Sequence, residues 1–159
     1  MNPVDVTDAS FTTDHVRYEI DFIKWSGENN KFIACLAHSR SDLYPARIFC
    51  LAAFLMGKHK NAYYSHMDWE EWYAYGSYWH TEIQPECAIE TGQPLEDYQL
   101  VDGLFSRQFE NCVALLNMND AAQDYTLPAG IWYTMRGESY SGTISVTRRQ
   151  GLVLVKERP

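Results

Sequence analysis

Apolar side chains recur every three or four positions over residues 14–26, and this spacing predicts an amphipathic helix. Thr13 or Asp14 can cap its start, and Gly27 supplies its end. The same spacing predicts a second helix over residues 42–57. The apolar faces of the two helices comprise Val16, Ile20, Ile23, Ile48, Leu51 and Leu55.

Between the two predicted helices lies an apolar run without alternation, residues 31–37. Such a run is typical of a strand that is covered on both faces, as in a parallel sheet. Helix, buried strand and helix form one segment of an α/β architecture. The predicted strand has no evident neighbour, so either another part of the chain pairs with it or the remaining strands of a barrel are missing. If they are missing, we expect its unpaired edges to favour self-association of the chain.

Residues 103–159 follow a different pattern, in which short runs of strand length alternate with turn signals about every ten residues. Ile144 and Val146, for example, alternate with polar neighbours. We expect an antiparallel β-sandwich here. The predicted strands are residues 104–109, 112–118, 123–127, 131–135, 143–147 and 152–157.

Together these patterns predict an α+β protein, with an N-terminal helix–strand–helix (a partial α/β barrel) followed by an antiparallel β-sandwich. Residues 1–61 form the barrel segment, residues 62–102 an aromatic-rich connection, and residues 103–159 the sandwich domain. Pro85 and Gly92 interrupt the connection, so irregular structure is expected there.

The charge balance excludes two classes of partner. Thirteen basic and twenty-one acidic residues give a formal net charge of −8, a field that repels nucleic-acid phosphates and anionic membrane surfaces. The longest apolar run, residues 48–56, is about half of the ~20 residues that a membrane helix needs. Residues 1–5 lack the basic-then-apolar layout of a signal peptide, which leaves the localisation open.

The four cysteines, at positions 35, 50, 87 and 112, show no metal-ligand spacing. Buried free thiols are expected, with disulfides as the alternative. The histidines also lack a ligand spacing, and there is no Gly-rich phosphate loop or local Ser-His-Asp signature. We therefore predict no metal and no cofactor.

Three segments carry a resemblance to a known family. Residues 103–111, Gly-Leu-Phe-Ser-Arg-Gln-Phe-Glu-Asn, and the apolar run after them resemble the junction where barrel ends and β-sandwich begins in a family of TIM-barrel glycoside hydrolases. Residues 84–95 are similar to that family's linker, and residues 132–138 to its closing strands. The resemblance covers residues 14–157 and implies the last barrel units plus the sandwich, with carbohydrate as the substrate class.

The chain departs from that family in two respects. Cys112 stands where the family usually has Gly, which would alter a hairpin turn. A complete barrel takes about 250 residues, so a chain of 159 residues cannot contain one.

Six residues are candidates for contacts with sugar. His38 and Arg40 follow the barrel-like strand, where the substrate loops of a barrel emerge. Four aromatic side chains could stack on sugar rings, namely Tyr64, Trp69, Trp72 and Trp79. The alternative is that the aromatic residues pack between barrel segment and sandwich, while His38 and Arg40 make local bonds.

No catalytic residue is predicted. Glycosidases use two carboxyl groups roughly 5–9.5 Å apart, and no acidic residue follows the predicted strand. Glu82, Glu86 and Glu90 are expected to be solvated, and Arg107 and Glu110 to form a surface ion pair. Two hypotheses follow: the chain is the C-terminal portion of a glycoside hydrolase, without activity alone, or it is a standalone module that binds carbohydrate or a protein.

Overall fold

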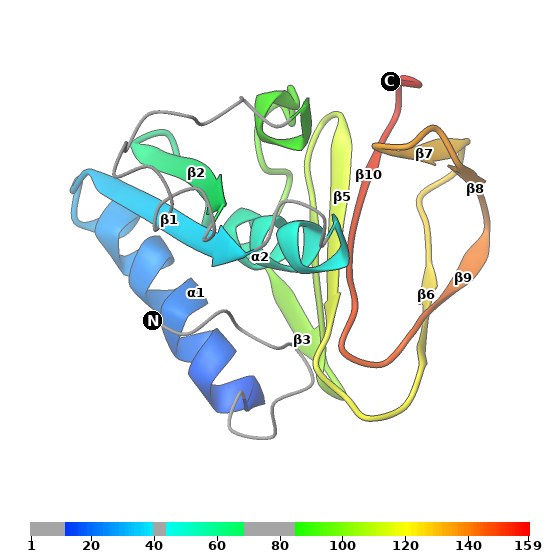
Figure 1. Cartoon of the computed structure of the whole chain (residues 1–159), viewed down its shortest axis with the longest axis horizontal. Coiled ribbons are helices and arrows are strands. Elements are labelled where there is room, and N and C mark those ends of the chain that lie inside the picture. Colours follow the sequence, from blue (N-terminus) through cyan, green and yellow to red (C-terminus); the bar gives the residue numbers. More distant parts are fainter. Residues whose placement is uncertain (1–11, 40–43, 69–84) are drawn as a thin grey trace.

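The computed structural model of the chain describes residues 12–39, 44–68 and 85–159. Two helices and a two-stranded parallel sheet lie on one side of a six-stranded antiparallel sheet, and a second antiparallel pair lies on its other side (Figure 1). The α+β class and the order of its parts are therefore as predicted. Neither helix in the described part of the chain is long and apolar enough to cross a membrane.

Helices α1 (Thr13–Glu28) and α2 (Tyr44–Gly57) lie close to their predicted ranges. Thr12 caps α1, rather than Thr13 or Asp14 as predicted, because Thr12 keeps an extended backbone and its hydroxyl accepts a hydrogen bond from the His15 N–H at 3.2 Å. The two helices approach closely where α2 ends. A Cβ at Gly57 would lie 2.7 Å from the Ile20 carbonyl oxygen.

Strand β1 (Ile33–Ser39) has a neighbour that the sequence analysis missed. Strand β2 (Ala62–Asp68) pairs with it in parallel, from Ile33 opposite Ala62 to Ser39 opposite Asp68. Of the two alternatives for this strand, the structure thus shows the one in which another part of the chain pairs with it, and the expectation of irregular structure at residues 62–68 is wrong. Tyr63, Ser65 and His66 place polar groups along β2, so this strand lacks the continuous apolar run by which β1 was found.

Only one face of the parallel sheet is covered by the described residues. Ile33, Cys35 and Tyr64 pack against the core that α1 and α2 share. On the opposite face Leu36 and Tyr63 are 51% and 56% exposed. The described residues therefore cover β1 on one face and not on both as predicted, and self-association stays a prediction.

The antiparallel part consists of a six-stranded sheet, in the order β3-β4-β5-β10-β7-β8, and a separate β6-β9 pair. A second apolar core that includes Leu115, Trp132 and Val146 joins the two sheets, which confirms the predicted sandwich of sheets. The strands are β3 (Gln99–Val101), β4 (Leu104–Gln108), β5 (Cys112–Asn117), β6 (Gln123–Thr126), β7 (Trp132–Thr134), β8 (Ser139–Tyr140), β9 (Thr143–Val146) and β10 (Gly151–Val155). The sequence analysis did not predict the short strands β3 and β8.

Helix α2 packs directly on the other face of the six-stranded sheet. Phe105, Leu116 and Val153 belong to the same core as α1 and α2. At Gly151 the backbones meet, since a Cβ there would lie 2.5 Å from the Cα of Phe49. The six-stranded sheet thus carries a core on each face, while the domain boundaries at residues 61 and 102 stay a prediction.

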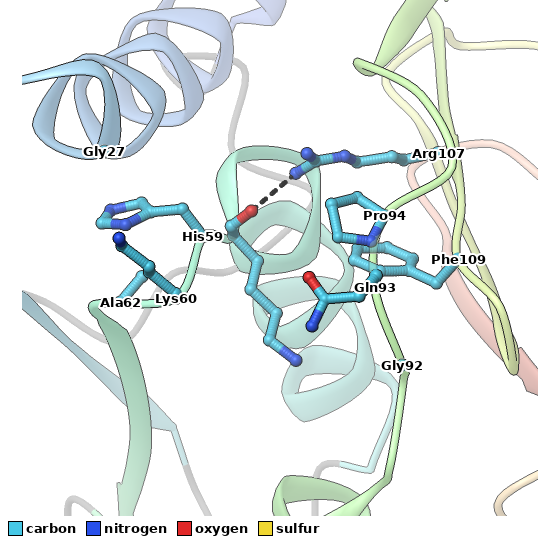
Figure 2. A pocket seen from close by; sticks show the side chains of 10 residues that line it. Gly27, His59, Lys60, Ala62, Gly92, Gln93, Pro94, Arg107 and Phe109 are labelled. Atoms are coloured by element: carbon cyan, nitrogen blue, oxygen red, sulfur yellow. Dashed lines mark hydrogen bonds between the residues drawn. The ribbon is translucent and has the colours of Figure 1, made fainter.

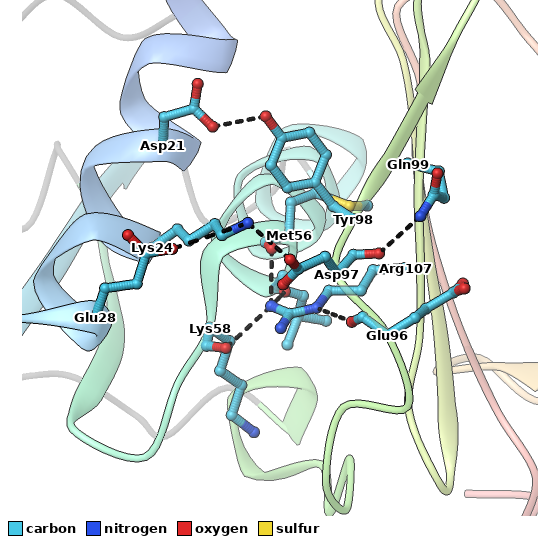
Figure 3. A network of polar contacts seen from close by, with 11 residues as sticks. Asp21, Lys24, Glu28, Met56, Lys58, Glu96, Asp97, Tyr98, Gln99 and Arg107 are labelled. Carbon is cyan, nitrogen blue, oxygen red and sulfur yellow. Dashed lines mark hydrogen bonds and ion pairs between the residues drawn. The ribbon is translucent and has the colours of Figure 1, made fainter.

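Arg107 lies in this interface between α2 and the sheet. It is only 7% exposed, and its Nη1 lies within hydrogen-bond distance of the carbonyl oxygens of Leu55, Met56 and Lys58, at 3.1, 2.8 and 3.0 Å (Figure 3). The last carbonyl groups of a helix lack partners within the helix, and a cation there also interacts favourably with the helix dipole. From strand β4, Arg107 therefore donates hydrogen bonds to the carbonyl groups at the end of α2.

The predicted surface ion pair between Arg107 and Glu110 is wrong. Arg107 Nε donates instead to the Glu96 carbonyl at 3.0 Å, and Glu110 accepts a hydrogen bond from the Gln93 N–H at 2.9 Å. Arg107 lies on β4 with its side chain against α2, whereas Glu110 lies in the turn between β4 and β5. Burial lowers the pKa of Arg107 from its ordinary value.

Two further polar contacts connect α1 with the segment that precedes β3. Lys24 Nζ donates to Asp97 at 2.8 Å, and the Tyr98 hydroxyl donates to Asp21 at 2.6 Å (Figure 3). Both contacts are exposed, so we expect each to contribute little beyond orientation.

Arg107→Met keeps much of the apolar stem but removes the guanidinium donor from the carbonyl groups at the end of α2, of which the Leu55 carbonyl keeps the Lys58 N–H at 3.3 Å. We expect the free energy of unfolding, measured by urea denaturation followed by circular dichroism, to fall by about 2–4 kcal/mol. The control is Arg17→Met, which removes the exposed pair with Asp21 and should cost less than ~0.5 kcal/mol. Equal losses in the two variants would contradict the role assigned to Arg107.

Candidate functional site

The parallel strands β1 and β2 end side by side at Ser39 and Asp68, which pair in register. Ligand sites in α/β structures form at the carboxyl ends of parallel strands. His38, which the sequence analysis selected, lies at this edge opposite Met67. Asp68 was not selected from the sequence because strand β2 was not predicted. Its position puts an acidic residue at the end of a parallel strand.

The described structure includes two of the six predicted sugar contacts, and for His38 it gives the backbone alone. Tyr64 lies on β2, where its ring packs against Phe54 at a centroid distance of 5.1 Å and its hydroxyl lies 3.3 Å from His66 Nδ1. Tyr64 is thus part of the packing between β2 and α2, and its contact with sugar stays a prediction. The other four, Arg40, Trp69, Trp72 and Trp79, lie outside the described residues.

A buried ion pair lies where α2 begins. Glu86 is 4% exposed, and its Oε1 lies 2.5 Å from the Nε of Arg47. The short 3-10 helix η1 (Pro85–Ala88) carries Glu86 against both α2 and β2. The prediction that Glu86 is solvated is therefore wrong. The sequence did not reveal the ion pair because Arg47 is 39 residues away from Glu86. Glu90 is exposed as predicted, and Glu82 lies outside the described residues.

Tyr44 connects this ion pair with the sandwich. Its ring lies between two guanidinium groups, with Arg136 at 3.9 Å and Arg47 at 5.6 Å from the ring centroid. Burial, and then the Glu86 carboxylate, raise the pKa of the Tyr44 hydroxyl from its ordinary value. Arg136 follows strand β7, so the cluster of Tyr44, Arg47, Glu86 and Arg136 draws on three parts of the fold.

This cluster can hold polar groups in fixed positions beside the carboxyl edge. A carboxylate paired with a guanidinium accepts hydrogen bonds and orients its partner, so Glu86 suits positioning of Arg47 better than direct proton transfer. Within residues 12–39, 44–68 and 85–159, there is no group of three or more His, Cys, Asp or Glu side chains that could hold a metal ion. Burial raises the pKa values of the Cys35 and Cys50 thiols to about 11 and of Cys112 to about 12, which makes them poor nucleophiles.

Glu86→Gln removes the carboxylate that faces the guanidinium of Arg47, whose side chain is 12% exposed. We expect the free energy of unfolding in urea to fall by about 2–4 kcal/mol, because a mostly buried guanidinium loses its ion pair with that carboxylate. Glu90→Gln is the exposed control and should change stability by less than ~0.5 kcal/mol. The double variant Arg47→Met, Glu86→Leu should regain at least ~1 kcal/mol over Glu86→Gln. Unchanged stability in Glu86→Gln would show that the pair does not matter for the fold.

A protein-family model matches the part of the chain that contains the parallel strands. The model of a family described as "Hypothetical glycosyl hydrolase family 15" matches residues 21–113. This range extends from α1 to the start of β5, so it includes both parallel strands, the Arg47–Glu86 pair and Arg107. No curated protein matched the chain. Because the family model covers more than half of its residues, the chain belongs to hypothetical glycosyl hydrolase family 15.

Proposed function

We propose that α1, β1, α2 and β2 form a section of the wall of a TIM barrel in a glycoside hydrolase, and that the carboxyl edge of β1 and β2 is part of its carbohydrate site. The observation that carries the proposal is the parallel pairing of β1 and β2 across the helical crossover α2. Strand, helix and parallel strand are the repeating unit of such a barrel. The order of the unit and the following sandwich also fits the resemblance at residues 103–111.

Among the described residues, helices cover one face of the parallel sheet and leave the other exposed, which supports this proposal. Both helices lie on one face, as they do on the outside of a barrel. The other face carries apolar and aromatic side chains, Leu36 and Tyr63 among them, which in a barrel would fill the interior in layers. An exposed apolar sheet face is unusual for a protein surface and fits a surface that other strands cover.

The residues at the carboxyl edge suit a carbohydrate. His38 and Asp68 lie at the ends of their strands, and hydroxyl groups of a sugar can donate to a carboxylate and bond with an imidazole. In the sequence, Trp69 directly follows Asp68, and Trp72 and Trp79 come soon after it. Flat aromatic rings can stack on the apolar faces of sugar rings. The Arg47–Glu86 pair would fix the start of α2 beside this edge.

Hydrolysis needs more than this edge provides. A glycosidase places two carboxyl groups on either side of the scissile bond, and barrel enzymes take them from the ends of several strands. The described part of the chain has two parallel strands, which end at Ser39 and Asp68. We therefore propose that the chain contributes sugar contacts to such a site and does not hydrolyse glycosides alone.

The test combines a turnover assay with a binding assay. The full chain should give no release of nitrophenol above background from a panel of aryl glycosides, because hydrolysis needs a pair of carboxyl groups and the two strand ends, Ser39 and Asp68, carry one. Tryptophan fluorescence should nevertheless shift on titration with oligosaccharides. Trp72→Ala should weaken that binding about tenfold, within the ~1–1.5 kcal/mol range of an aromatic contact.

The matched control is Trp25→Ala, which removes a half-exposed tryptophan from the outer side of α1 and should leave the titration unchanged. Turnover that disappears in Asp68→Asn would overturn the proposal that the chain is inactive alone. A flat titration with every oligosaccharide would overturn the carbohydrate site and favour the alternative of a protein-binding module.

A further inference from the structure

A cavity of about 610 Å³ lies at the other end of the parallel strands, next to the start of β2 (Figure 2). Its walls come from the end of α1 at Gly27, the loop between α2 and β2, the segment of residues 92–94, and the side chains of Arg107 and Phe109. Strand β2 has seven residues, so this cavity is roughly 20 Å from the carboxyl edge. It is a separate place from the proposed carbohydrate site.

The cavity is basic in a protein whose formal net charge is −8. Lys58, Lys60 and Arg107 line it, and in the described structure none of the three has a carboxylate within 4 Å. A concave wall of one charge sign focuses the field and raises the local concentration of counter-ions. The cavity therefore has the charge that an anion requires.

Lys58 places an ammonium group in the wall of the cavity. Its ammonium group carries three N–H bonds, one of which is directed to the Thr91 hydroxyl at 2.5 Å. The group lies 5.9 Å from the centroid of the Phe109 ring, on which Arg107 also packs at 5.2 Å. Burial, with a smaller effect from Arg107, lowers the pKa of Lys58 from its ordinary value. A bound anion would offset the repulsion between Lys58 and Arg107 and the cost of removing them from water.

His59 forms a neutral wall of the cavity. The Ser26 hydroxyl donates to the Ile23 carbonyl at 2.7 Å, so its oxygen accepts from His59 Nε2 at 2.8 Å. The other ring nitrogen, Nδ1, accepts the Asn61 N–H at 3.2 Å. The neutral imidazole thus makes hydrogen bonds through both of its nitrogens. Burial lowers the pKa of His59, which also favours the neutral form. The positive charge of the cavity comes from the lysines and Arg107.

Three carboxylates lie near the cavity without lining it. Glu110 Oε2 accepts the Gln93 N–H and would lie 2.6 Å from a Cβ at Gly92. Asp97 and Glu96 influence Arg107 from the side of α1 and β3, and Asp97 is bound to Lys24. None of these three lines the cavity.

We propose that this cavity binds a small polar molecule through a phosphate or carboxylate group, with Lys58 and Lys60 as donors and Arg107 contributing its charge. Nε and Nη1 of Arg107 are engaged with carbonyl groups, so Arg107 contributes mainly its charge to the cavity. Pro94, Phe109 and Ala62 supply apolar surface for the body of the molecule, and the volume is within the range of small-molecule sites.

The experiment is calorimetric titration of the full chain at low ionic strength with three probes: inorganic phosphate, glucuronate and glucose. Binding of phosphate or of glucuronate supports the proposal and identifies which oxyanion the cavity takes. Binding should weaken as salt is added, because the contact is between charges. Glucose is the neutral control, and glucose that binds as tightly as glucuronate would overturn the proposal, as would the failure of both oxyanions to bind.

Two variants locate the binding. Lys60→Ala changes an exposed side chain and Lys58→Met retains the stem over Phe109, and each should weaken oxyanion binding roughly tenfold or more. Lys31→Met is the matched control, since it makes the same change of charge at an exposed residue outside the cavity, and it should leave binding within about twofold. An equal loss in Lys31→Met would show that only the net charge matters and would overturn the site.

Discussion

The contact between Arg107 and the last carbonyl groups of α2 determines where the α/β part lies relative to the sandwich. A buried guanidinium needs acceptors and the end of a buried helix needs donors, so each side would carry a desolvation cost without the other. Apolar packing alone would allow α2 to slide along the sheet, since it has little directional preference. Three carbonyl groups surround one nitrogen, Arg107 Nη1. This directional contact fixes the position of α2 along the sheet and its orientation.

The position of α2 in turn places both candidate sites. The helix has 14 residues and is therefore about 21 Å long. Its start carries Tyr44 and Arg47 to the carboxyl edge of β1 and β2, where Glu86 and Arg136 meet them. Its end leads into Lys58, which lines the basic cavity. One helix thus connects a proposed carbohydrate site at one end of the parallel sheet with a proposed oxyanion site at the other.

Sequence reasoning succeeded where the determining interactions are local. Alternation and turn residues are features of neighbouring positions, and they located six strands of the sandwich; helical spacing located α1 and α2. It failed for β2, whose exposed face carries Tyr63 and Ser65 and whose pattern resembles that of a loop. It also failed for Glu86 and Arg107, whose partners are 39 residues and about 50 residues away. A charged side chain looks solvated in a sequence unless its distant partner is known.

The same limit applied to the candidate site. His38 could be selected because it follows an apolar run, whereas Asp68 gained its place only through pairing with β1. The basic cavity brings together residues 27, 58–60, 92–94 and 107, and no window of the sequence contains that charge pattern. Spatial clustering of this kind depends on the parallel crossover and on the contact of α2 with the sheet.

Native-state hydrogen exchange tests most directly whether α2 and the sandwich form one cooperative unit held by Arg107. The account predicts that the slowest amides of α2, in Phe49–Leu55, and those of β5 and β10 exchange with the same opening free energy, equal to that of global unfolding. Slow amides in β5 and β10 together with α2 amides that open at a clearly lower free energy would contradict it, because the helix could then leave the sheet while the sandwich stayed folded.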